Sequence, residues 1–325
     1  MLTRRDLLIR VASAGGVAHA RWTASLLAAP AAQPSTPVNF DVPTNACDCH
    51  THVFGDPQQF PFVPTRVYTP EPASVDEMRK LHRALRVDRV VVVQPSVYGT
   101  DNACTLDSLR RLGSRARGVA VIDDKTPESA LDEMQRAGVR GIRVNLETAG
   151  VTDPAGARQR FEAAVGRVRP RRWHIQIFTR LPIIEALHDQ FAASPVPVVF
   201  DHFGGAQASR GTAQAGFETL VALVRSGHAY VKISGAYRSS TRAPDYEDVV
   251  PLAKALIAAN PRRILWGTDW PHPDSAVVPG RRNTDIAPLL QIDDGRVMNQ
   301  LPAWTADAAV RKRILVENPT ELYGF

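Results

Sequence analysis

The chain has 325 residues, of which 44% are hydrophobic, and it carries a formal net charge of +6. Half of this surplus falls in residues 1–33, which hold Arg4, Arg5, Arg10 and Arg21 against Asp6. The remaining +3 is scattered, without a basic stripe or a glycine loop for phosphate, which argues against a nucleic-acid partner. Three cysteines are too few for a disulfide scaffold, and we interpret them as small buried hydrophobic residues.

The start of the chain resembles a bacterial twin-arginine export signal. Arg4 and Arg5 precede a mildly apolar stretch, and small residues that suit a peptidase occur near 18–20 and 28–32. His19, Arg21 and Trp22 interrupt that stretch, so it makes a poor membrane anchor. We therefore expect residues 1–33 to engage the twin-arginine export machinery, which implies a periplasmic or exported protein. The alternative is a disordered or helical extension of a cytoplasmic protein. Residues 34–45 then form a polar linker that contains proline.

Eight short apolar runs alternate with amphipathic stretches over residues 46–325. The runs are 46–52, 90–94, 118–122, 141–145, 173–179, 196–201, 229–234 and 263–269. Helical periodicity marks 74–85, 128–137, 183–191, 217–224 and 250–259, and Ser74 with Glu77 forms a capping box before the first. Continuous apolar runs are typical of parallel strands covered by helices. This pattern predicts a single-domain (β/α)8 TIM barrel, with a doubly wound open sheet as the alternative.

In such a barrel the chemistry belongs at the carboxyl ends of the strands. Polar residues lie at or after these ends: His50, His52, Ser96, Tyr98, Arg143, Asn145, His202, Ser234, Tyr237, Arg238 and Asp269. Residues two apart on a strand face the same side, so His50 and His52 should converge, with Asp48 beside them and Cys47, Cys49 and Thr51 facing away. Two histidines and an aspartate at strand ends suit hydrolysis, with or without a metal ion.

Six segments together resemble the amidohydrolase superfamily, amidohydrolase-related family 2. They are 48–55, 94–102, 141–145, 201–204, 266–273 and 318–325, and they span about residues 45–325 in the right order. The nearest resemblance is to the metal-independent lactonase branch. It implies a hydrolase, either a lactonase or a lactone isomerase, that acts on a carboxylated or sugar-acid lactone.

The resemblance also implies roles for individual residues. Asp269 becomes the general base for water, and His50, His52 and His202 polarise the lactone carbonyl or orient the water. Arg143 is the first candidate to clamp a substrate carboxylate and Arg238 the second. Further candidates for contact with the substrate are Tyr68, Ser96, Tyr98 and Lys232.

Metal-using relatives add a histidine at the end of the fifth strand, where this chain carries Gln176 or Phe178. His174 lies too near the start of that strand. We therefore expect no cofactor. The alternative is a metal-dependent amidohydrolase or decarboxylase with zinc or manganese on His50, His52, His202 and Asp269. A non-catalytic periplasmic binding protein is a third hypothesis.

Two departures from the branch bear on the substrate. No cation follows Arg143 in residues 146–150, where Glu147 would instead repel an anion, and Phe178 replaces a tyrosine. Both favour a monocarboxylate or sugar-acid lactone over a dicarboxylate.

Overall fold

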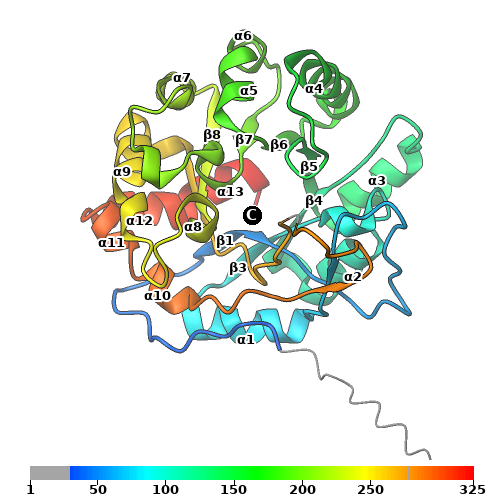
Figure 1. Ribbon diagram of the computed structural model, residues 1–325, viewed down its shortest axis with the longest axis horizontal. Coiled ribbons are helices and arrows are strands. Elements are labelled where there is room, and N and C mark those ends of the chain that lie inside the picture. The colour runs from blue at the N-terminus through cyan, green and yellow to red at the C-terminus, as the bar shows by residue number, and fades with distance from the viewer. Residues whose placement is uncertain (1–29, 277) are drawn as a thin grey trace, which may run out of the picture.

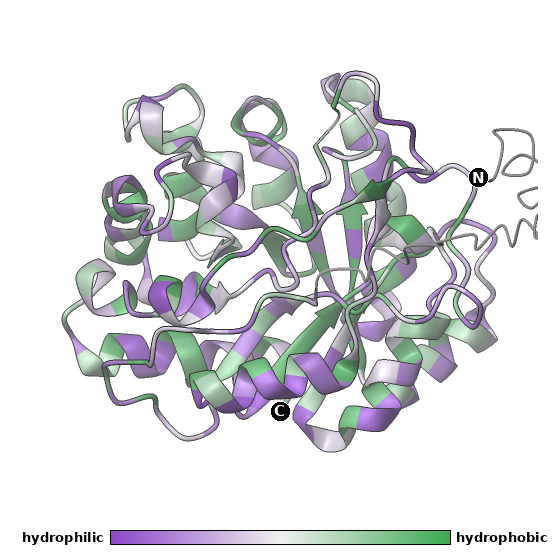
Figure 2. Cartoon of the chain, turned by 60° about the horizontal axis from the view of Figure 1, so that its bottom comes forward, coloured by the Kyte–Doolittle hydropathy of each residue, from purple (hydrophilic) through white to green (hydrophobic). Residues whose placement is uncertain are grey.

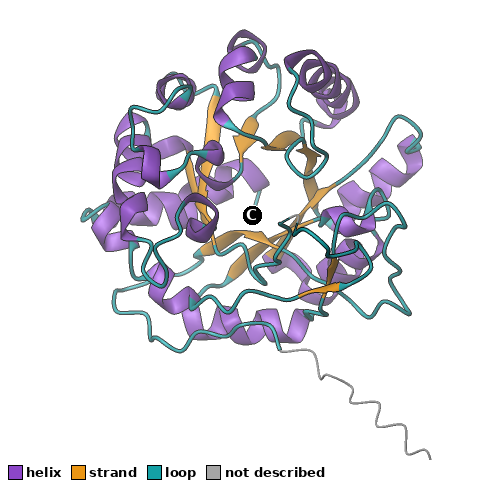
Figure 3. Ribbon diagram, viewed as in Figure 1, coloured by secondary structure: helices purple, strands orange, loops and turns teal. Residues whose placement is uncertain are grey.

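The protein is a closed ring of parallel strands surrounded by helices (Figures 1 and 3). The computed structural model describes residues 30–276 and 278–325, so all but the last four residues of the predicted export signal lie outside the described residues. The strands are β1 (Cys47–Thr51), β3 (Arg89–Val93), β4 (Ala116–Ala120), β5 (Val139–Asn145), β6 (His174–Phe178), β7 (Val198–Phe200), β8 (Ala229–Ser234) and β9 (Ile264–Gly267). They pair in that order. The Asp269 N–H donates to the His50 carbonyl at 2.9 Å and the His52 N–H to the Trp270 carbonyl at 2.8 Å, which joins β9 to β1. The predicted (β/α)8 barrel is confirmed.

Helices cover the outside of the strands. Those between strands are α1 (Val75–Leu85), α2 (Ala103–Leu112), α3 (Glu128–Ala137), α4 (Pro154–Val168), α5 (Leu181–Ala186), α6 (His188–Ala192), α7 (Phe217–Arg225), α8 (Ala236–Ser239) and α9 (Val250–Ala259). After β9 come α10 (Asp294–Met298), α11 (Leu301–Trp304), α12 (Ala308–Lys312) and α13 (Asn318–Tyr323). A small sheet pairs β2 (Thr69–Pro70) with β10 (Ile286–Ala287). The Ser74–Glu77 capping box is present as predicted, whereas the helix predicted over 183–191 breaks at Leu187, whose ψ of 20° is not helical.

Apolar residues fill the barrel and the layer between strands and helices. Figure 2 shows hydrophobic colour along the strands and helices that carry both colours. The inner cluster consists of Cys47, Cys49, Val91, Val93, Val119, Val199, Tyr230, Leu265 and Tyr323. All three cysteines are free and buried, as expected. No helix of the described residues is long and apolar enough to cross a membrane.

The end of the chain closes one mouth of the barrel, and Figure 1 shows it in the middle of the strand ring. Tyr323 is fully buried in the inner cluster. The guanidinium groups of Arg89 and Arg117 each lie 4.7 Å from the Phe325 ring, and Arg117 also donates to the carbonyl of Gly324 at 2.6 Å. With the base closed in this way, the opposite end, where the strands finish, is left for chemistry.

The segment predicted as a linker lies against the barrel. The side chains of Ser35 and Thr36 donate to Asp293 at 2.7 and 2.6 Å, and Arg86 donates to the carbonyls of Val38 and Phe40. These contacts attach residues 34–45 to the ends of α10 and α1.

Candidate active site

A bulge in β1 brings the two histidines into the barrel. Asp48 pairs with Val90 and Thr51 with Val92, so three steps along β1 match two along β3. The prediction that Asp48 faces the same side as His50 is therefore wrong. Asp48 lies 3.2 Å from His82 of α1 and accepts from Thr268 at 2.6 Å, whereas Cys47 and Cys49 belong to the inner cluster. The bulge interrupts the strict alternation of side chains along β1. The side chains of Cys47 and Cys49 therefore point into the barrel near the start of the strand, and those of His50 and His52 point into it near the end.

His202 and Asp269 lie just beyond their strands rather than at the strand ends that the sequence predicts. β7 ends at Phe200 and β9 at Gly267, and both residues adopt positive φ, +47° for His202 and +68° for Asp269. Such backbone is uncommon for residues other than glycine and is found at functional sites. Gly235, itself at φ +55°, approaches both side chains so closely that a Cβ there would lie 3.1 Å from each.

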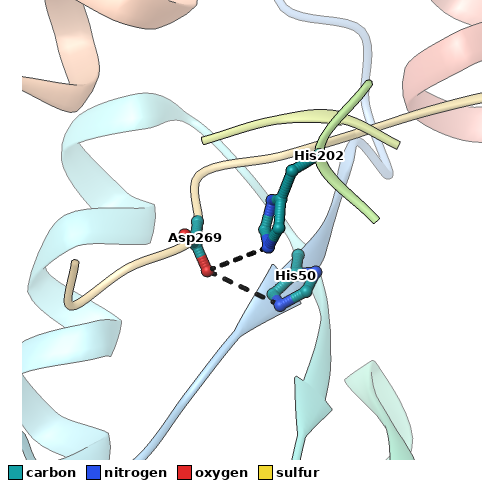
Figure 4. A group of neighbouring side chains, drawn as sticks. All are labelled: His50, His202 and Asp269. Atoms are coloured by element: carbon teal, nitrogen blue, oxygen red, sulfur yellow. Dashed lines mark ion pairs between the residues drawn. The ribbon is translucent and has the colours of Figure 1, made fainter. Parts of the chain in front are cut away.

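Three imidazoles surround one oxygen of Asp269, as Figure 4 shows for two of them. Asp269 Oδ1 lies 3.5 Å from His50 Nε2, 3.6 Å from His52 Nε2 and 3.8 Å from His202 Nε2. These distances are too long for direct hydrogen bonds. Both His50 Nε2 and Asp269 Oδ1 are buried without a hydrogen-bond partner among the described residues. The four groups therefore converge on a point that a small polar species can occupy.

Polar contacts behind the rings indicate which nitrogens carry protons. His52 Nδ1 lies 2.8 Å from the Val93 carbonyl, which can only accept, so Nδ1 is the protonated nitrogen and Nε2 faces Asp269 as an acceptor. His50 Nδ1 lies 3.2 Å from a carboxylate oxygen of Asp201, which favours the same tautomer. His202 differs, because its Nδ1 lies 3.0 Å from the Ser234 hydroxyl, which can donate or accept.

The second oxygen of Asp269 is held by two donors. Oδ2 accepts from the Tyr237 hydroxyl at 2.6 Å and from Arg238 Nε at 2.5 Å. Burial alone would raise the pKa of Asp269, but the charge of Arg238 holds it well below its usual range. Tyr237 lies after a strand end, yet nothing in the sequence singles it out as a partner of Asp269.

The same burial keeps the imidazoles neutral. Desolvation lowers the pKa of His50 well below its ordinary value and lowers that of His52 too. The pKa of His202 falls to about 4, mainly by desolvation, although Asp269 and Asp201 oppose the shift. At neutral pH the site therefore presents neutral imidazoles around an ionised carboxylate.

A second buried network lies below the histidines. Asp201 Oδ2 accepts from Arg143 Nε at 3.2 Å and from Gln176 Nε2 at 3.1 Å. Lys232, which is fully buried, donates to Gln176 Oε1 at 2.6 Å and lies 3.7 Å from Asp201. Gln176 is one of the two residues at the position where a metal-binding histidine would be expected. Its side chain instead bridges Lys232 and Asp201. Asp201 is a central member that the sequence indicated only as the neighbour of His202.

The charges of the two networks do not cancel. In the described ion pairs of these networks, Arg143, Lys232 and Arg238 face two carboxylates, Asp201 and Asp269, so with neutral imidazoles and a protonated lysine one positive charge is left over within them. Burial lowers the pKa of Lys232, while the adjacent Asp201 raises it. A buried surplus of positive charge favours an anionic ligand.

The remaining predicted residues divide into two groups. The Tyr68 hydroxyl lies close to Ser96 and in the field of Arg238 and Arg143, which places both residues near the cluster. Tyr98 instead accepts from the Gly55 N–H at 3.0 Å and packs against Phe62 with ring centroids 5.2 Å apart. Its described contacts are therefore structural.

A cavity of about 540 Å³ opens onto the cluster. Its walls include Phe178, His202, Tyr237 and Arg238. The Phe178 ring meets the His202 ring edge-on, with centroids 5.3 Å apart.

The rim of this cavity carries a cation that the sequence did not single out. Arg180, which follows β6, donates from Nε to both oxygens of Glu147, at 2.8 and 2.7 Å, and both residues line the cavity. The expectation that Glu147 would repel an anionic substrate is therefore weakened, because its charge is paired.

Comparisons with known proteins agree with this geometry. Residues 47–325 match the family described as Amidohydrolase. The chain is 34% identical to 4-sulfomuconolactone hydrolase of Hydrogenophaga intermedia, over 89% of this chain and 91% of that one. It is 35% identical to the 2-pyrone-4,6-dicarboxylate hydrolase of Comamonas testosteroni, over 90% and 94%, and 29% identical to D-galactarolactone isomerase of Agrobacterium fabrum, over 76% and 80%. An apo crystal structure from Agrobacterium tumefaciens superposes with a TM-score of 0.73 at 26% identity, covering 90% of this chain and 98% of that one. The chain is therefore a hydrolase that belongs to the amidohydrolase family.

Proposed function

We propose that the protein opens a lactone that bears a carboxylate or is derived from a sugar acid, without a metal ion. The observation that carries this proposal is the convergence of three imidazole nitrogens on Oδ1 of Asp269, while Arg238 and Tyr237 hold Oδ2. The relatives named above for lactone substrates support the substrate class. The surplus positive charge around Arg143 supports an anionic group on the substrate.

The tautomers assign different tasks to the histidines. A water between Asp269 Oδ1 and the acceptor nitrogens of His50 and His52 can donate both protons and turn a lone pair toward a carbonyl. His202 is the remaining donor. When the Ser234 hydroxyl donates to its Nδ1, Nε2 carries a proton and can hydrogen-bond the lactone carbonyl oxygen. Asp269 is then the general base, and Arg143 with Arg238 orients the substrate anion.

Residues of the site can assist both the attack of water on the lactone carbonyl and the cleavage of the ring C–O bond. The water oxygen bonds to the carbonyl carbon as Asp269 takes a proton. The developing negative charge on the carbonyl oxygen is stabilised by the His202 N–H. Collapse breaks the bond between that carbon and the ring oxygen, and the proton held by Asp269 passes to the departing oxygen. The product is the ring-opened acid.

A metal-dependent hydrolase is the second candidate, because the donor set fits a divalent ion. Ligand atoms of His50, His202 and Asp269 lie within 4.8 Å of one another, and His52 faces the same carboxylate oxygen. A zinc or manganese ion there would act as a Lewis acid on the carbonyl or water. Two observations favour the metal-free proposal. The cluster already carries surplus positive charge, and Gln176 is engaged with Lys232 and Asp201.

The deciding experiment measures hydrolysis of a lactone panel by protein of known metal content. The panel contains carboxylated, sugar-acid and neutral lactones, assayed before and after treatment with a chelator. We expect turnover of an anionic lactone by protein with less than about one-tenth of an equivalent of metal, unchanged by the chelator. Loss on chelation with recovery on addition of zinc or manganese would establish the second candidate. No turnover of any lactone would refute the proposed substrate class.

A further inference from the structure

A second cavity, of about 580 Å³, adjoins the site at Arg143. Ser96, Asn145 and the buried Arg143 are part of its lining. It is separate from the cavity that holds His202 and Arg238, and the two approach each other at Phe178, whose ring centroid lies 5.1 Å from the Arg143 guanidinium carbon and 5.9 Å from that of Arg238. Arg143 therefore stands between the reacting groups and the second cavity.

The walls of the second cavity are apolar. Its apolar lining consists of Val121 and Ile122 after β4, of Ile142 and Val144 of β5, and of Ala163 and Ala164 of α4, the helix that covers β5 and β6 (Figure 1). Besides Arg143, the charged residues of its lining are Asp123, Asp124 and Arg160, which are exposed, and Arg167, which is half-buried. Val121, Ile122 and Val144 are partly exposed there, although they are large apolar side chains. The lining thus combines a buried cation, Arg143, with apolar side chains and with charged residues that are mostly exposed.

We propose that this cavity binds an apolar arm of the substrate, an alkyl or aryl substituent on an anionic lactone. This inference rests on the proposed function and adds the shape of its substrate. A cavity of several hundred Å³ is the size that encloses a drug-sized ligand, and the catalytic cavity alone already meets that range. A compact lactone whose substituents are all charged would leave the apolar walls unused. A carboxylate paired with Arg143 anchors the ring, and the arm passes between the ends of β4 and β5 toward α4.

The experiment compares lactones that differ only in arm length. The substrates are a monocarboxylated γ-lactone with a methyl substituent and its propyl and hexyl homologues. Each buried methylene contributes about a fourfold gain in binding. The hexyl homologue adds five methylenes, so in the wild type kcat/KM should rise from methyl to hexyl by about 10³ if all five are buried and by about tenfold if only two are. Hexanoate and octanoate should inhibit competitively, the longer acid more strongly.

Ala163→Trp tests the position of the arm, because Ala163 is exposed on α4 and its side chain borders the cavity. We expect this variant to lose the preference for the hexyl substrate while its kcat/KM for the methyl substrate stays within about twofold. The smaller substitution Ala163→Leu should remove only part of the preference for the hexyl substrate. Ala155→Trp is the matched control, since Ala155 is exposed on the same helix and does not line the cavity.

Each possible result supports or contradicts the proposal that the second cavity binds an apolar arm of the substrate. Equal kcat/KM for the three homologues in the wild type, or equal loss on all three in Ala163→Trp, would overturn the arm site while leaving lactone hydrolysis intact. Hydrolysis of none of them, with direct binding of octanoate, measured by calorimetry, still weaker in Ala163→Trp than in the wild type, would support the arm site and refute the lactone ring. A preference that Ala155→Trp also removes would show an effect of helix stability instead and would overturn the assignment.

Discussion

At the scale of single residues, the two carboxylate oxygens of Asp269 have different roles in the site. One oxygen is anchored by Arg238 and Tyr237, and the other faces the imidazoles. The anchoring fixes the direction of the free oxygen, which a general base needs. It also lowers the basicity of Asp269, so placement has to compensate for a weak base.

Asp269→Asn tests the general base. Asparagine tolerates the positive φ of +68° at this position, so the fold should be retained. The amide cannot take a proton from water, and kcat should fall by about 10² to 10⁴. Steady-state kinetics on the identified lactone, with circular dichroism and thermal unfolding as the folding check, measure this. A folded variant that keeps most of its kcat would move the base to one of the histidines.

The pH profile of kcat/KM should reflect neutral imidazoles. Because the pKa of His202 is about 4 and those of His50 and His52 are also lowered, the rings become protonated at lower pH than an ordinary histidine. Asp269 remains ionised over the same range. We expect kcat/KM to be flat from about pH 8 to 5 and to decline at lower pH, with an apparent value that belongs to the coupled cluster. An acid limb centred near 6.5, the ordinary value for histidine, would contradict this assignment.

At the scale of the strands, β6 carries a histidine whose role is structural. His174 is buried at the base, with no hydrogen-bond partner for either ring nitrogen among the described residues, and its ring packs edge-on against Tyr323 at 5.2 Å. A Cβ at Gly141 on β5 would lie 2.2 Å from the His174 ring, so only glycine fits beside it. Desolvation and the charge of Lys232 lower its pKa to about 3.

This histidine should make stability dependent on pH. Between pH 6.5 and 3 the unfolded chain binds a proton at position 174 and the folded protein does not, so stability is lost as the pH falls. At pH 4.5 the loss from this group is on the order of 2 to 3 kcal/mol relative to pH 7.5. Urea unfolding of the wild type and of His174→Gln at both pH values measures it. The variant should lose about that much less stability on acidification, and equal losses in both proteins would contradict the prediction.

The strands also show where sequence reasoning succeeds and where it fails. The apolar runs and their following polar residues predicted the barrel, and His50, His52, His202 and Asp269 indeed come together. The prediction from strict alternation was wrong for the side on which Asp48 lies. The bulge depends on how β1 pairs with β3, and the sequence of β1 alone does not reveal that pairing. The pairing of Glu147 with Arg180 was also missed, since it joins the ends of two strands 33 residues apart. Contacts made by loops after strands depend on backbone geometry, such as the positive φ of His202, that no periodicity encodes.

At the scale of the whole molecule, the barrel reaches further toward the N-terminus than the sequence indicates. Ala31 and Ala32 are only 2% and 5% exposed and pack into the apolar layer. The carbonyl of Ala32 accepts from the Trp270 indole at 3.0 Å, directly beside Asp269 in the chain. Residues predicted to end the export signal thus support the backbone that carries the candidate base.

We propose that the protein is exported through the twin-arginine route and is cleaved near residues 18–20 rather than 28–32. The sequence around Arg4 and Arg5 motivates the route, and the buried contacts of Ala31 and Ala32 favour the earlier of the two cleavage regions. Mass spectrometry of the protein recovered from the periplasm should therefore show an N-terminus before Ala31.

Arg4→Lys combined with Arg5→Lys should retain the uncleaved chain in the cytoplasm, while Arg10→Lys, which preserves the twin arginines, should not. A mature protein that begins at Gln33 or later would show that the Ala32–Trp270 contact is dispensable. A mature protein that begins at Met1, or export indifferent to the double substitution, would show that the N-terminal residues are not a signal.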